Sequence, residues 1–136
     1  MTLLHGFTYN GHPAACAAAL KNLEILVQER LVENAAAMGA YLREQLAELA
    51  ERPYVGEVRS LGLLAAVELV ADRASRRPFE PSQKVGERVR DAARGHGLIC
   101  RAIGDSIALA PPLVITRSEM DQVVSALDHA LRAVLG

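Results

Sequence analysis

Cysteine and lysine are both scarce in this 136-residue sequence. The two cysteines, Cys16 and Cys100, lie far apart among apolar residues and form no Cys-x-x-Cys motif. Disulfide frameworks and thiolate metal sites need more cysteines at closer spacing. We therefore expect two reduced, buried thiols in a cytoplasmic protein and no metal site. The two lysines, Lys21 and Lys84, limit any chemistry that requires a lysine amine.

Long apolar runs and basic clusters are also missing. No stretch approaches the ~18 consecutive apolar residues that a transmembrane helix needs, and the N-terminus lacks the pattern of a signal peptide. The net charge of −1 argues against a nucleic-acid surface. We expect neither a membrane nor a nucleic acid as partner. The sequence instead has a globular balance, with 51% hydrophobic and 23% charged residues.

Residues 5–13 form a polar loop punctuated by glycine, HGFTYNGHP, that runs directly into an alanine-rich segment. Pro13 suits the first turn of a helix because its missing N–H needs no partner there, and alanine is the best helix former. Unpaired N–H groups and the helix dipole make such a start suitable for an anion. Most loops of this kind only cap a helix, so a phosphate site and a plain cap both remain open.

The first 53 residues are predicted to be mostly helical. Apolar residues recur at helical spacing after Pro13, and a second helix is predicted from about Val32 to Glu51. Gly39 weakens that helix by up to about 1 kcal/mol without breaking it. The apolar face of this helical arm is too wide for the remaining residues to cover. We expect it to pack on a segment absent from the chain or on another copy.

After residue 53 the periodicity changes from helical to alternating. Two strands are predicted between Val55 and Leu69, separated by the Ser60-Leu61-Gly62 segment. A hairpin is predicted from Leu98 to Ala110, because a glycine and an aspartate separate its two apolar runs. Residues 113–115 are predicted to be short and extended.

Two further helices are predicted in this half. Ser82 is the predicted N-cap of one helix, which ends at Gly95 and Gly97. Thr116 and Glu119 have the spacing of a capping box at the start of the last helix. The sequence therefore predicts an α+β fold: a long helical arm, then a small, mainly antiparallel sheet covered by helices.

Arg101 is the most informative single charge, because it interrupts an apolar strand pattern. A guanidinium there must point outward to water or meet an acid, since burial without a partner is very costly. Spacing alone favours the outward orientation by about two to one. The planar guanidinium also suits a carboxylate clamp. No catalytic set can be assembled from the four histidines and their neighbours in the sequence.

Three blocks of this sequence resemble class III (omega-type) aminotransferases, which depend on pyridoxal phosphate. The blocks are residues 5–19, residues 58–69 and residues 97–116. They occur in the order found in the family and cover nearly the whole chain, so together they are specific. Asn10 and Ser60 depart from the commoner serine and glycine. The first change is conservative, whereas the second can alter a turn.

The resemblance implies the C-terminal part of a fold-type-I enzyme, a dimer with active sites at the subunit interface. It implies that Phe7 and Thr8 hold the cofactor phosphate of the neighbouring subunit, and that Arg101 binds the carboxylate of an amino or keto acid. Residues 1–53 then end the large domain, and residues 54–136 form the small C-terminal domain. The implied reaction transfers an amino group between an amine or amino acid and a keto acid or aldehyde.

The family's Schiff-base lysine precedes the threonine loop, as do the aspartate that faces the pyridine nitrogen and the aromatic that stacks on the ring. Neither Lys21 nor Lys84 matches a cofactor lysine. We therefore expect this chain to contain no catalytic residue and to be inactive by itself. An alternative of another class is a non-catalytic module, or the remnant of a truncated gene, that dimerises through the helical arm.

Overall fold

The computed structural model describes residues 6–136, so His5 of the predicted loop lies outside the described residues. The chain divides into two compact units, residues 1–32 and residues 33–136, and each is described by itself. The predicted boundary after residue 53 concerns the domains of a complete enzyme and stays a prediction.

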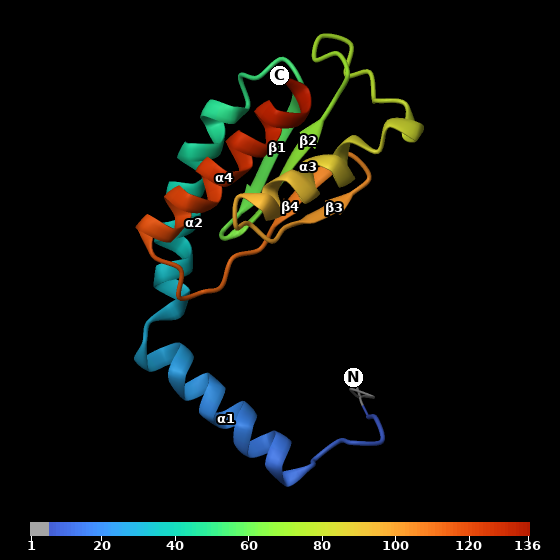
Figure 1. Cartoon of the computed structure of the whole chain (residues 1–136). Coiled ribbons are helices and arrows are strands. Elements are labelled where there is room, and N and C mark those ends of the chain that lie inside the picture. Colours follow the sequence, from blue (N-terminus) through green and yellow to red (C-terminus); the bar gives the residue numbers. More distant parts are fainter. Residues whose placement is uncertain (1–5) are drawn as a thin grey trace. The chain divides into compact units, whose positions relative to one another are not determined.

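The first unit consists of a loop and helix α1, Pro13–Gln28 (Figure 1). Pro13 occupies the first turn, as predicted, and His12 is the N-cap residue. The helix buries none of its residues. Its large apolar side chains are more than half exposed, at Leu20, Leu23 and Val27. This exposure agrees with an apolar face that the chain does not cover by itself.

The second unit contains a four-stranded antiparallel sheet with the strand order β1-β2-β4-β3. Both predicted strand pairs are confirmed, but Ser60 and Leu61, predicted to lie between the first two strands, belong to β1. The second pair begins at Arg101 instead of Leu98, because residues 98–100 form no sheet ladder. The strands are β1 Val55–Leu61, β2 Leu64–Leu69, β3 Arg101–Ile103 and β4 Ser106–Leu109.

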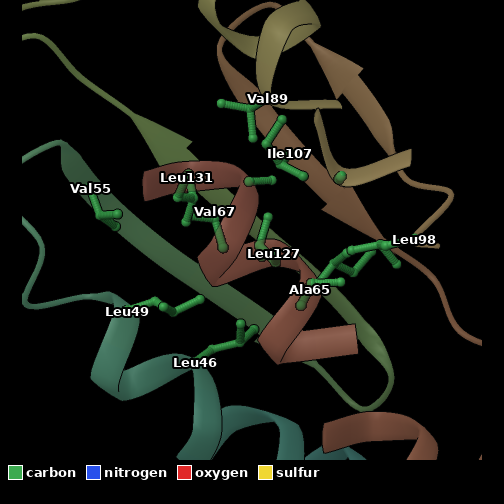
Figure 2. Packing of buried hydrophobic residues seen from close by; sticks show 14 of the residues in the cluster. Leu46, Leu49, Val55, Ala65, Val67, Val89, Leu98, Ile107, Leu127 and Leu131 are labelled. Carbon is green, nitrogen blue, oxygen red and sulfur yellow. The ribbon is translucent and has the colours of Figure 1, made fainter. Parts of the chain in front are cut away.

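Three helices lie along one face of this sheet (Figure 1): α2 Leu31–Leu49, α3 Val85–Gly95 and α4 Arg117–Leu135. Figure 2 shows how Val67 and Ile107 of the sheet meet Leu127 of α4, with α2 contributing Leu46 to the same cluster. Strand alternation sends every second side chain into this core. The opposite face of the sheet carries the exposed side chains of Leu61, Leu64 and Ile103, and we call it the open face.

Of the two predicted helix N-caps in this unit, one is confirmed and the other is wrong. The capping box of α4 is confirmed, with the Glu119 N–H 3.3 Å from Thr116 Oγ1 and the Thr116 N–H 2.8 Å from Glu119 Oε2. The predicted N-cap Ser82 is wrong, since Ser82 lies in a short 3-10 turn, Pro81–Gln83, and α3 begins only after Lys84.

Two smaller expectations are also corrected. Residues 113–114 form a turn instead of an extended segment, closed by a hydrogen bond from the Ile115 N–H to the Pro112 carbonyl at 3.0 Å. Cys16 is exposed in this chain, because α1 buries nothing. Cys100 is half-buried, and that burial raises the pKa of its thiol. Within residues 6–136, no helix is both long and apolar enough to cross a membrane.

Candidate functional site

Phe7 and Thr8 lie in the loop that precedes α1. Two backbone hydrogen bonds shape this loop, from the Asn10 N–H to the Phe7 carbonyl at 2.9 Å and from the His12 N–H to the Tyr9 carbonyl at 3.3 Å. Phe7 is 61% exposed, and Thr8 is exposed as well. Among the described residues, the Thr8 hydroxyl has no hydrogen-bond partner. This hydroxyl is therefore available to an external group.

The start of α1 offers fewer free donors than its sequence indicates. Pro13 has no N–H, the Ala15 N–H points to His12 Nδ1 at 3.4 Å, and the Cys16 N–H donates to the His12 carbonyl at 2.9 Å. Part of the donor capacity that a helix N-terminus offers to an anion is thereby used. A phosphate at this loop would have the Thr8 hydroxyl as a further donor. An unpartnered hydroxyl in an exposed loop fits such a contact.

Arg101 is the first residue of β3, the edge strand next to β4. Its guanidinium is exposed and, within residues 6–136, has no hydrogen bond or ion pair. The neighbouring Ala102 is partly buried and contacts the core cluster. Arg101 therefore points to the open face, as strand alternation predicts. The structure leaves it free for a carboxylate but does not test that role.

A row of four residues crosses the open face in register. Arg59 pairs with Ala66, Ala66 with Ala108, and Ala108 with Arg101. The two central side chains of this row are methyl groups, and the surface is hollowed beside them, next to Arg59. The hollow has a volume of about 390 Å³, and its lining includes Arg59, Leu61, Leu64, Ala66 and Ala108.

The two arginines of this row differ in their partners. The Arg59 guanidinium lies 2.9 Å from Glu57 Oε2 and 3.1 Å from Glu68 Oε2. These two acids raise the pKa of Arg59, the hydrogen bond to Glu57 contributing most. Arg101 has no such neighbour among the described residues. Of the two, only Arg101 can therefore accept a new carboxylate without giving up an ion pair.

The hairpin that carries Arg101 is held by residues that sequence reasoning treated only as a turn. The Asp105 carboxylate accepts a hydrogen bond from the Gly86 N–H at 3.0 Å. Gly104 packs so closely on α3 that a Cβ at Gly86 would lie 2.1 Å from its carbonyl oxygen. A glycine in the first turn of a predicted helix was the signal that could have indicated this contact.

The predicted site residues are divided between the two units. Phe7 and Thr8 belong to the first unit and Arg101 to the second. Of the two lysines, Lys21 on α1 has its Nζ 3.1 Å from Glu24 Oε2, and Lys84 precedes α3. Within the described residues, no group of three or more potential ligands could hold a metal ion.

Known proteins resemble the chain over nearly its full length. A model of the family "Aminotransferase class-III" matches residues 1–131. The chain is 48% identical over 133 residues to a diaminobutyrate–2-oxoglutarate transaminase of Halomonas elongata, covering 96% of this chain and 28% of that protein. It is 43% identical over 136 residues to a putrescine–pyruvate aminotransferase of Pseudomonas aeruginosa, covering 96% and 30%.

Solved structures agree with these relatives. An (S)-enantioselective omega-transaminase from Thermomicrobium roseum superposes with a TM-score of 0.93 at 52% identity, covering 100% of this chain and 30% of that one. An aminotransferase from Vibrio fluvialis, in a PMP-bound form, gives a TM-score of 0.92 at 41% identity, covering 98% and 29%. The chain thus spans about 30% of the length of these proteins. It belongs to the class-III aminotransferase family.

Proposed function

We propose that this chain is the C-terminal part of an aminotransferase that depends on pyridoxal 5′-phosphate. The reaction moves an amino group between an amine or amino acid and a keto acid or aldehyde. The observation that carries the proposal is the unpartnered Arg101 guanidinium at the edge of the open face, inside a segment that matches the family. The two named relatives are transaminases of 2-oxoglutarate and of pyruvate, both of which are keto acids with a carboxylate.

Arg101 binds the substrate carboxylate in this proposal. Two parallel N–H groups of a guanidinium can donate to the two oxygens of a carboxylate, which fixes orientation as well as binding energy. The methyl-lined hollow beside Ala108 leaves room for the rest of an acidic substrate. A substrate without a carboxylate has no use for this contact.

Phe7 and Thr8 contact the cofactor phosphate in the proposed site. Pyridoxal phosphate is the cofactor of the family, and when bound it supplies the electron sink and carries the amino group. The Thr8 hydroxyl donates to a phosphate oxygen, and the exposed Phe7 lies against the same group. In a dimer these two residues serve the neighbouring subunit.

The dimeric state, the cytoplasmic location and the domain boundary after residue 53 belong to the same proposal. The exposed apolar residues of α1 support an interface with material outside this chain. The low cysteine content supports a reducing compartment.

The role of Arg101 can be tested in a complete enzyme. In this enzyme the chain replaces the matching segment of the Thermomicrobium roseum transaminase, to which it is 52% identical. We expect Arg101→Ala to raise the KM for a keto acid by about 10- to 100-fold, since a charged hydrogen-bonded contact is lost. The KM for an aldehyde acceptor should change little. Steady-state kinetics with both acceptors would measure the difference.

Arg88→Ala is the matched control, because Arg88 is exposed on α3 and its side chain has no hydrogen-bond or ion-pair partner within the described residues. It should leave both KM values unchanged. If Arg101→Ala raised the KM for the keto acid and the KM for the aldehyde equally, the carboxylate assignment would be overturned.

The exposed α1 also supports a second function, a non-catalytic module that dimerises through its helical arm. Adding pyridoxal phosphate to the 136-residue chain and sizing the chain in solution test these expectations. A lysine-dependent absorbance band would contradict the expectation that no cofactor lysine is present. A clean monomer in a sizing experiment would count against the module.

A further inference from the structure

The tip of the β3–β4 hairpin is fastened to two other elements of the fold. Asp105 Oδ1 accepts a hydrogen bond from the Gly86 N–H in the first turn of α3 at 3.0 Å. The Asp105 backbone carbonyl accepts another from the Leu69 N–H, at the end of β2, at 2.9 Å. One residue therefore ties the tip to a helix on one side and to the sheet on the other.

The contact also depends on the absence of a side chain at Gly86. A Cβ there would lie 2.1 Å from the Gly104 carbonyl oxygen and 3.1 Å from the Asp105 Cα. Both neighbours are backbone, so they cannot rotate away as a flexible side chain could. Gly104 itself has a φ of 56°, which favours glycine at the tip.

Asp105 further supplies a cap that the local sequence of α3 does not provide. The residue before α3 is Lys84, whose φ of 47° is uncommon for a residue other than glycine, and its side chain makes no cap hydrogen bond. The carboxylate of Asp105 satisfies a first-turn N–H from 19 residues away. A negative charge at a helix N-terminus is also electrostatically favourable.

The position of Arg101 depends on this fastening. Strand β3 has only three residues and pairs on one side only, with β4. Arg101 pairs with Ala108 at the end of the ladder remote from the tip. A strand this short gains little rigidity from its ladder, so its placement relies on the docked tip and on Cys100 and Ala102, which are partly buried against the core.

We propose that Asp105 and Gly86 are positioning residues that hold the β3–β4 hairpin so that the Arg101 guanidinium is presented in the geometry a substrate carboxylate requires. This inference rests on the proposed function of Arg101. Bidentate binding needs close alignment of two N–H groups with two oxygens, so small displacements of the hairpin weaken it.

The first test uses the 136-residue chain and measures backbone hydrogen exchange. Asp105→Ala should raise the exchange rates of residues 101–106 and of the Gly86 amide by about fivefold, the equivalent of losing a helix cap. Residues of α4 and of the β1–β2 pair should keep their rates. Asp105→Asn, which retains an acceptor oxygen, should give a smaller rise. A rise of equal size throughout the unit would overturn the local fastening.

The second test uses the complete enzyme described above. Asp105→Ala should raise the KM for a keto acid by about fivefold while the KM for an aldehyde stays unchanged. Adding Asp105→Ala to Arg101→Ala should produce no further rise, because both changes act on the same contact. Asp91→Asn, which alters an exposed acid of α3 paired with Arg90, is the matched control and should change neither value.

The two proposals fail in different ways. If Arg101→Ala leaves the keto-acid KM unchanged, the proposed function of Arg101 is overturned. If Arg101→Ala raises that KM and neither Asp105→Ala nor Gly86→Ala does, only the positioning role is overturned. The positioning role would also be overturned if Asp105→Ala changed the KM for the keto acid and the KM for the aldehyde equally. Equal changes would show that Asp105 has only a structural role.

Discussion

On the open face, the existing partners of an arginine determine whether its guanidinium can bind another carboxylate. Arg59 and Arg101 share one register row, and both are exposed. Arg59 forms ion pairs with Glu57 and Glu68, whereas Arg101 forms none with the described residues. Both guanidiniums are charged at any ordinary pH. The two arginines therefore differ in whether the guanidinium is already held in ion pairs. This difference favours Arg101 as the residue that contacts a substrate carboxylate.

The capping box of α4 gives a pH-dependent prediction at the same scale. Hydrogen bonds from the Thr116 backbone N–H and hydroxyl hold the pKa of the Glu119 carboxyl below its ordinary value. A lowered folded-state pKa stabilises the fold fully above about pH 4.5, and the contribution is lost as the pH falls through the folded pKa. Glu119→Gln removes this titration but keeps an acceptor oxygen.

We expect the unmodified chain to have a higher Tm than Glu119→Gln at about pH 7. This difference should shrink at about pH 3. Thermal unfolding followed by circular dichroism measures it. The other carboxyls titrate in both proteins, so the comparison isolates Glu119. A difference that is the same at both pH values would contradict the prediction.

At the scale of elements, glycines allow two helices to pack closely against the turns of the two hairpins. Gly39 of α2 lies against Gly62, the turn between β1 and β2, and a Cβ at Gly39 would be 2.5 Å from the Gly62 carbonyl carbon. Gly86 and Gly104 repeat the arrangement between α3 and the second hairpin. Gly39 was expected only to weaken its helix. Its absent side chain instead permits contact between two backbones.

Gly39→Ala should therefore destabilise the protein by about 1–3 kcal/mol through overpacking. The opposite sign would follow from helix propensity alone, which favours alanine by about 1 kcal/mol. Urea unfolding measures the change. Gly95→Ala is the control, because nothing lies within 4 Å of a Cβ at Gly95 in the last turn of α3, and it should be neutral or stabilising.

At the scale of the whole molecule, the hydrophobic core belongs to the second unit. The core cluster begins at Leu42 and includes residues of α2, the sheet, α3 and α4, whereas α1 buries none of its residues. Since apolar burial is the main favourable term in folding, the second unit should fold without the first. The first unit should depend on material outside this chain.

A shortened chain of residues 31–136 tests this division. We expect it to unfold cooperatively, with nearly the same urea midpoint and m value as the full chain, because the m value follows the surface exposed on unfolding. The far-ultraviolet circular dichroism should lose the contribution of the 16 residues of α1. Loss of a cooperative transition would show that α1 contributes to the core.

The sequence by itself determined the features that depend on residues close along the chain. The two hairpins follow from alternating periodicity and turn residues, and the α4 capping box from residues three positions apart. The outward orientation of Arg101 follows from strand alternation. The resemblance of three sequence blocks indicated the family, which the comparisons confirm.

Only the tertiary structure decided the features that depend on distant partners. The cap of α3 comes from Asp105 on a hairpin, so Ser82 was wrongly predicted. Cys16 is exposed because α1 finds no cover in this chain. The fastening of the Arg101 hairpin joins the Gly86 N–H to the Asp105 carboxylate, 19 residues away, and needs the close approach of Gly104 to Gly86. A local pattern carries no information about which distant backbone will approach, and close packing of the folded chain settles it.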